Sequence, residues 1–169
     1  MNFLEQLAAE WYAYRGYFVR TNVKFGRRRA GGYEGEMDVV AFHPREKVLV
    51  HVEPSMDADS WRQREQKFRR KFRDAEEHYG ELFQFHYERV DRVAVCGWGR
   101  SLPQDVSFGD IVIKTLPSFV SEIMKELKRH DPYKDIVPEH WPLLRALQMG
   151  LHWGTVPVGE TRPNALADD

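Results

Sequence analysis

The sequence is short of cysteine and of long apolar runs. One cysteine, Cys96, stands among 169 residues. This excludes a disulfide framework and any zinc site built from cysteines, and it is typical of a reducing compartment. No apolar run approaches the roughly 18 residues that a membrane-spanning helix requires. The N-terminal residues also lack the charged and apolar regions of a secretion signal. Together these absences predict a cytoplasmic protein with no membrane partner.

A surplus of charge of either sign is also missing. The chain has 25 Lys and Arg against 26 Asp and Glu, for a net charge of −1. Such a balance by itself argues against a nucleic-acid partner, because cationic side chains supply most of that affinity. The charges are not evenly mixed, however. The segment from Arg62 to Arg73 holds seven basic residues and one acid, Glu65. This density favours an anionic partner over a merely solvated helix face.

A second basic group lies in a glycine-containing segment near residues 24–29. We therefore expect nucleic acid, first of all DNA, to contact residues from both groups. The residues expected to bind it are Arg27, Arg28, Arg29, Arg62, Lys67, Arg70 and Lys71.

The order of apolar patterns predicts an α/β fold. Helical spacing predicts helices over residues 2–15, 59–79, 118–129 and 139–149, and β-favouring runs predict strands over 17–24, 36–42, 48–53, 90–96 and 110–115. We expect one domain over residues 1–153, with a mixed sheet of about five strands. Residues 154–169 have little to bury and are expected to form a flexible C-terminal tail.

Two acidic residues fall in strands that are otherwise apolar. The short connection between the strands at 36–42 and 48–53 predicts an antiparallel hairpin, which can bring Asp38 and Glu53 together. Buried carboxylates are costly unless they are compensated. Mg²⁺ or Mn²⁺ is the simplest compensation, because these ions prefer oxygen ligands. Salt bridges to the basic helix are the structural alternative.

An ordered set of short motifs resembles the PD-(D/E)xK nuclease superfamily, which includes restriction endonucleases, Holliday-junction resolvases and YraN-type proteins. The motifs cover roughly residues 3–75, and they are Glu5, Gly16-Tyr17, Gly35-Glu36-Met37-Asp38 and Val52-Glu53-Pro54-Ser55. The superfamily pattern is a helix-one Glu, a strand-two Asp and a strand-three Glu-x-Lys, followed by a helix. The resemblance implies a restriction endonuclease-like, three-layer α-β-α core.

The resemblance also implies roles for individual residues. Asp38 and Glu53 would be metal ligands, and the backbone carbonyl of Pro54 would be a third metal contact. Glu5 would reach the metal directly or through water. The chain departs from the pattern at Ser55, which occupies the position of the catalytic lysine, and a hydroxyl cannot supply that positive charge. Lys67, or an arginine of the same helix such as Arg62, is the candidate for the missing cation.

These observations predict a Mg²⁺- or Mn²⁺-dependent nuclease that hydrolyses phosphodiester bonds of DNA, with RNA as the alternative substrate. Its expected catalytic residues are Glu5, Asp38, Glu53, Ser55 and Lys67. The substitution at Ser55 keeps a second hypothesis open, namely a cleavage-deficient module of the same fold that binds nucleic acid or a protein. A third hypothesis is a structural α/β protein. Many members of the superfamily are dimers, so the resemblance also leaves room for a homodimer.

Overall fold

The computed structural model describes residues 2–97 and 106–154, whose strands form one six-stranded mixed sheet. The strand order is β1-β2-β3-β4-β6-β5, and β3, β4 and β6 run parallel to one another. The strands are β1 (Phe18–Arg27), β2 (Tyr33–His43), β3 (Val48–Ser55), β4 (Arg89–Cys96), β5 (Val106–Phe108) and β6 (Ile111–Thr115). The helices are α1 (Phe3–Tyr14), α2 (Trp61–Glu76), α3 (Tyr79–Leu82), α4 (Leu116–Leu127) and α5 (Pro142–Trp153).

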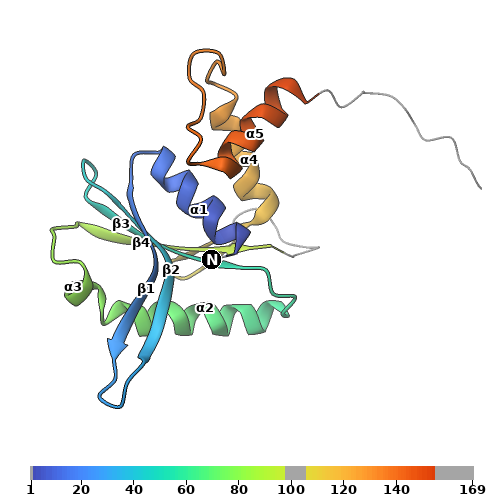
Figure 1. Ribbon diagram of the computed structural model, residues 1–169. Coiled ribbons are helices and arrows are strands. Elements are labelled where there is room, and N and C mark those ends of the chain that lie inside the picture. Colours follow the sequence, from blue (N-terminus) through green and yellow to red (C-terminus); the bar gives the residue numbers. More distant parts are fainter. Residues whose placement is uncertain (1, 98–105, 155–169) are drawn as a thin grey trace, which may run out of the picture.

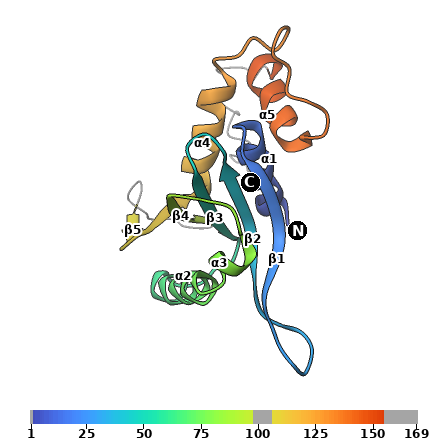
Figure 2. The same cartoon turned by 90° about the vertical axis from the view of Figure 1, so that its left-hand side faces the viewer.

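Helices cover both faces of the sheet, so the molecule has three layers (Figures 1 and 2). One face packs against α1, α4 and α5 through a core that includes Leu4, Trp11, Val50 and Phe119. The other face packs against α2 and α3 through two smaller apolar clusters. This arrangement confirms the expected α/β class, the three layers and the mixed sheet. The sheet has six strands rather than about five, because the three-residue β5 is too short to leave a pattern in the sequence.

The helix α2, which carries the dense group of basic residues, is stabilised by a cap at its first turn and by one stripe of buried apolar residues. Ser60 caps α2 and forms a capping box with Gln63. The apolar residues Phe68, Phe72 and Ala75 recur at helical spacing, and all three are buried against the sheet. The expected helix over 59–79 is therefore confirmed in type, but it ends at Glu76 and the chain continues into the short α3.

The strands β2 and β3 pair only over part of their length, and the point where they separate defines the candidate site. Their antiparallel register runs from His43↔Val48 to Val39↔Val52. Asp38 and Glu53 are the next residues on the two strands. Strand β3 continues beside β4 to Ser55↔Cys96, whereas β2 continues beside β1 alone. The two acids thus lie at a fork in the sheet.

Over residues 2–97 and 106–154, no helix is long and apolar enough to cross a membrane. The expected tail falls almost wholly on residues 155–169, which lie outside the described residues; Gly154 is the C-cap of α5.

Candidate active site at the fork of the sheet

Asp38 and Glu53 converge on the ammonium group of Lys71. Lys71 Nζ donates a hydrogen bond of 3.0 Å to Asp38 Oδ2 and also contacts Glu53 Oε2. The backbone N–H of Asp38 donates to the other Glu53 oxygen, Oε1, at 3.3 Å. Two carboxylates from β2 and β3 therefore surround one cation position on the α2 side of the sheet. This is the convergence that the hairpin pairing predicts.

Glu53 is held from behind by a buried chain of polar groups. Its side chain is 1% exposed, and its Oε1 lies 2.7 Å from Nε2 of His51, which is fully buried. His51 Nδ1 lies 2.7 Å from the hydroxyl of Tyr79. A neutral His51 satisfies both contacts if Nε2–H donates to Glu53 and Nδ1 accepts from the tyrosine. The histidine thus fixes one Glu53 oxygen and leaves the other for a cation.

Burial and mutual repulsion separate the acidities of the two carboxyl groups. Burial, followed by repulsion from Glu53, raises the pKa of Asp38 to about 7. Burial would also raise the pKa of Glu53, but the hydrogen bond from His51 and the charge of Lys71 lower it to about 2. Glu53 is therefore the permanent anion, while Asp38 gains or loses its proton near neutral pH. Two neighbouring acids whose pKa values differ this strongly are typical of functional sites.

Lys71, which is not among the expected catalytic residues, is the lysine that contacts both acids. Lys67 was the expected replacement for the missing lysine, but its Nζ contacts Asp57 in the turn after β3. Lys71, one helical turn later, is the residue that reaches the two acids, although the sequence suggested only a nucleic-acid contact for it. A signal was present: Lys71 lies three residues after Phe68 and four before Ala75, so it lies beside their buried stripe on the side of the helix that faces the sheet.

Ser55 belongs with Asp57 rather than with the carboxylate pair. Its hydroxyl donates to Asp57 Oδ2 at 3.1 Å and accepts from the Asp57 backbone N–H at 3.3 Å. The contact with Lys67, followed by the hydrogen bond from Ser55, lowers the pKa of Asp57. The contacts of Ser55 and Lys67 thus stabilise the turn that leads into α2, and these contacts do not connect them to Glu53.

The structure assigns clear local roles to two acids of α1. The Glu5 carboxylate completes the capping box at the start of the helix: it accepts from the Asn2 backbone N–H at 3.0 Å and from Asn2 Nδ2 at 2.6 Å. Glu10 is buried, and its Oε2 accepts from the backbone N–H groups of Leu143 and Leu144 at 2.9 and 3.0 Å. Glu10 therefore caps α5, while a metal contact by Glu5 stays a prediction.

The backbone of Pro54 is oriented toward the fork. The Ser55 carbonyl accepts from Gly97 N–H at 2.8 Å, so it points to the β4 side of β3. Successive carbonyls of an extended strand point to opposite sides, so the Pro54 carbonyl points toward the side that β2 has left. A proline is tolerated here because the missing N–H also faces this side.

The oxygen atoms at the fork suit a small cation that prefers oxygen ligands, provided that substrate or water supplies the remaining ligands. Among the residues that the structure describes, no group of three or more His, Cys, Asp or Glu side chains is placed to hold a metal. Asp38, Glu53 and the Pro54 carbonyl offer two carboxylates and one carbonyl. Mg²⁺ is commonly held by one or two carboxylates together with waters and phosphate oxygens, so this set suits it.

The expected nucleic-acid contacts divide into two surfaces. Arg62 and Arg70 are exposed on α2, and Arg27, Arg28 and Arg29 are exposed where β1 turns toward β2. Lys67 and Lys71 are only partly exposed because each contacts an acid. Within the described residues, Lys71 is the one expected nucleic-acid contact that lies at the fork itself.

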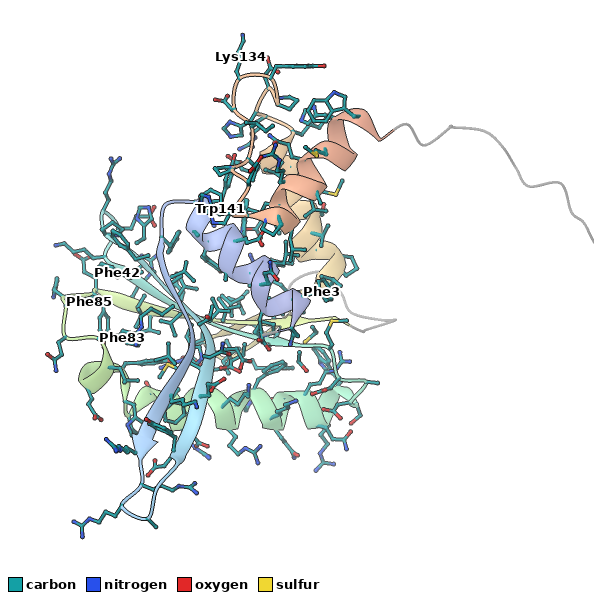
Figure 3. The ribbon with its side chains drawn as sticks, in the orientation of Figure 1. Phe3, Phe42, Phe83, Phe85, Lys134 and Trp141 are labelled. Carbon is teal, nitrogen blue, oxygen red and sulfur yellow. The ribbon has the colours of Figure 1, made fainter. Side chains whose placement is uncertain are left out.

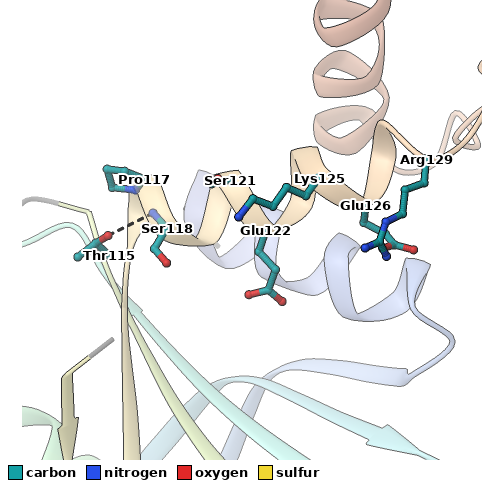
Figure 4. A pocket seen from close by; sticks show the side chains of 8 residues that line it. All are labelled: Thr115, Pro117, Ser118, Ser121, Glu122, Lys125, Glu126 and Arg129. Carbon is teal, nitrogen blue, oxygen red and sulfur yellow. Dashed lines mark hydrogen bonds and ion pairs between the residues drawn. The ribbon is translucent and has the colours of Figure 1, made fainter. Parts of the chain in front are cut away.

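Two other hollows lie away from these residues. A groove of about 680 Å³ runs along α4, where Glu122, Lys125, Glu126 and Arg129 line it (Figure 4). Its charged side chains alternate in sign, and Arg129 donates to Glu126 at 2.9 Å. A smaller apolar hollow of about 320 Å³ lies where Phe42, Phe83 and Phe85 gather (Figure 3). Neither hollow carries a converging pair of acids.

Comparison of the chain with protein-family models, with curated proteins and with solved structures finds no match.

Proposed function

We propose that this protein is a divalent-metal-dependent nuclease related to the PD-(D/E)xK superfamily, and that it hydrolyses phosphodiester bonds of DNA. The observation that carries the proposal is the convergence of Asp38 and Glu53 on one cation position at the fork between β2 and β3. The exposed arginines of α2 and of residues 27–29 support a polyanionic substrate.

The carboxylates and the Pro54 carbonyl would hold Mg²⁺ or Mn²⁺. Such an ion neutralises a phosphate oxygen and lowers the pKa of a water molecule that it binds. Glu53, held by His51, provides a fixed anionic ligand. Asp38 must be ionised to bind the ion, so we expect metal binding to strengthen as the pH rises toward the pKa of Asp38.

Lys71 would supply the positive charge that the superfamily places at the position of Ser55. Its ammonium already lies beside both acids, so it could neutralise a phosphate oxygen when a metal binds them. Binding of the metal requires Lys71 to give up at least one of its two carboxylate contacts. The lysine side chain is flexible and 32% exposed, which makes this exchange feasible.

A nuclease assay tests the proposal. Plasmid, branched and single-stranded DNA, together with RNA of matched sequence, would be incubated with the protein in Mg²⁺ or Mn²⁺ and, separately, with a chelator. We expect chelator-sensitive cleavage of DNA that Asp38→Asn and Glu53→Gln each reduce by about 100-fold or more. Asp57→Asn is the matched control, because it removes the same charge from the neighbouring turn. Equal cleavage by wild type and both fork variants would falsify the site.

The ion cluster also favours a second candidate. Lys71 compensates the two acids without any metal, and Ser55 stands at the position of the motif lysine. The same surfaces could then bind nucleic acid without cutting it. Salt-dependent DNA binding with no cleavage under any metal supports this candidate. The absence of both binding and cleavage leaves a purely structural role for the cluster.

A further inference from the structure

A two-stranded ribbon extends from the fork. The last pair between β2 and β3 is Val39↔Val52, yet β1 and β2 remain paired as far as Arg27↔Tyr33. Residues 23–27 and 33–37 thus leave the sheet together, and residues 28–32 form the tip. Figures 1 and 2 show this hairpin projecting beyond the sheet and past α2. Asp38 lies at the base of the ribbon.

The base of the ribbon is anchored, so its direction is set before any partner binds. Val23, Phe25 and Met37 are buried in one cluster with Ala75 and Tyr79. The Phe25 ring also lies directly over Gly35, where a Cβ atom would be 2.4 Å from the ring. A side chain at that position would therefore displace the phenylalanine. An anchored ribbon loses little conformational freedom on binding.

The tip of the ribbon is cationic. Arg27, Arg28 and Arg29 are exposed, and within the described residues no ion pair involves them. Two acids lie on the β2 half of the ribbon. Glu34 lies 3.4 Å from His78 Nε2, and Glu36 is opposite Lys24 in the register. Residues 23–37 carry four cations, namely Lys24 and the three arginines, against these two acids, so the ribbon keeps a net positive charge.

The dimensions of the ribbon match double-helical DNA. Tyr33 lies five residue steps along the extended strand from Asp38, which at about 3.3 Å per step corresponds to about 17 Å. The major groove of B-form DNA, about 12 Å wide, admits a two-stranded ribbon. The major groove of duplex RNA is too narrow and deep for such a ribbon. A single strand offers no groove at all.

We propose that residues 23–37 form an arm that binds duplex DNA. The arm places Arg27, Arg28 and Arg29 against the groove and phosphates of the duplex. The backbone of the same duplex lies at Asp38 and Glu53. The inference rests on the proposed function for the position of the duplex, and it adds the substrate class. The arm would hold the duplex about half a helical turn from the fork, while the exposed arginines of α2 contact the same backbone.

Fluorescence anisotropy with the full chain tests the arm. The probes are a duplex DNA, the corresponding single strand and a duplex RNA, all measured with chelator present so that no probe is cut. The arm variant is Arg27→Ala/Arg28→Ala/Arg29→Ala. The control is Lys125→Ala/Lys128→Ala/Arg129→Ala, which removes the same charge from the C-terminal end of α4 and the residues that follow it, on the opposite side of the sheet.

We expect the arm variant to lose about tenfold or more in affinity for duplex DNA, and the slope of log affinity against log salt to fall by about 2 to 3. Its affinity for the single strand should change by less than about threefold, and the α4 control should bind like wild type. An arm variant that binds duplex DNA like wild type, or that loses affinity equally for all three probes, overturns the inference.

The binding and cleavage results together distinguish a failure of the arm proposal from a failure of the nuclease proposal. Cleavage by a protein whose arm variant still binds duplex DNA normally overturns the arm alone. Duplex binding that depends on the arm, in a protein that never cuts, supports the arm and contradicts the nuclease. A wild-type protein that binds no duplex DNA overturns the arm, whatever single-stranded substrate it cuts.

Discussion

Lys71 Nζ lies 3.0 Å from Asp38 Oδ2, and this contact joins a helix to a strand 33 residues earlier in the chain. The same ammonium contacts Glu53, so one cation serves two carboxylates. The charges do not balance, and the pKa of Asp38 rises to about 7 as a result of burial and of the remaining repulsion from Glu53. The fork is therefore a site that one further positive charge would stabilise.

Removal of Lys71 should destabilise the metal-free protein. Lys71→Met leaves the acids at the fork without their cation, and we expect a loss of about 1 to 3 kcal/mol in unfolding free energy, a value reduced for the partial exposure of the lysine. Mg²⁺ should restore part of the loss. Urea unfolding with and without Mg²⁺ measures both effects. Lys67→Met is the control, and its loss should be below about 1 kcal/mol because Asp57 is exposed.

The pH dependence of stability should reveal Asp38. Its pKa is near 3.8 when unfolded and about 7 when folded, so the folded state binds the extra proton. Stability from this group is complete below pH 4 and is lost as the pH rises to 7, by an amount on the order of a few kcal/mol. Glu53, whose pKa is lowered to about 2, acts in the opposite direction, and its contribution is lost as the pH falls below about 4.5.

Asp38→Asn isolates this effect in the window between pH 5 and 7. The variant should lack the downward slope that wild type shows there without metal, as measured by chemical unfolding at a series of pH values. Saturating Mg²⁺ should also flatten the slope of wild type, because the ion replaces the proton. Identical slopes in wild type and variant would show that the pKa of Asp38 is not raised.

His51 should matter for stability more than its isolated position on a strand suggests. His51→Phe leaves Glu53 Oε1 and the Tyr79 hydroxyl without their buried partner, at a cost of about 2 to 4 kcal/mol in unfolding free energy. Tyr79→Phe leaves the contact between His51 and Glu53 in place and should cost about 1 kcal/mol. Thermal unfolding of the two variants tests the order, and a larger effect from Tyr79→Phe would contradict it.

Ser55→Ala should leave any cleavage rate within about threefold of wild type, because the hydroxyl contacts Asp57 and not the acids of the fork. Lys71→Ala should reduce the rate by about 100-fold or more. Initial rates of plasmid nicking compare the two. A strong loss in Ser55→Ala together with an intact Lys71→Ala would return the catalytic role to the position of Ser55.

Alternating strand patterns and a short turn were enough to predict that Asp38 and Glu53 meet. They could not predict which lysine reaches the pair, because Lys67 and Lys71 are one helical turn apart and the choice depends on how α2 lies on the sheet. They also missed the length of the ribbon. Met37 and Val39 are two residues apart yet pack into different clusters. On the paired strand, Asn22 lies between the partners of these two residues and has a positive φ of 53°.

Binding of Mn²⁺ to wild type and to Asp38→Asn/Glu53→Gln, followed by electron paramagnetic resonance of the free ion at pH 8, tests the central claim most directly. The account predicts one Mn²⁺ site per wild-type chain that Mg²⁺ displaces and that the double variant loses, while Asp57→Asn retains it. Wild type that binds no Mn²⁺, or a double variant that binds it as tightly as wild type, would contradict the assignment of the fork as a metal site.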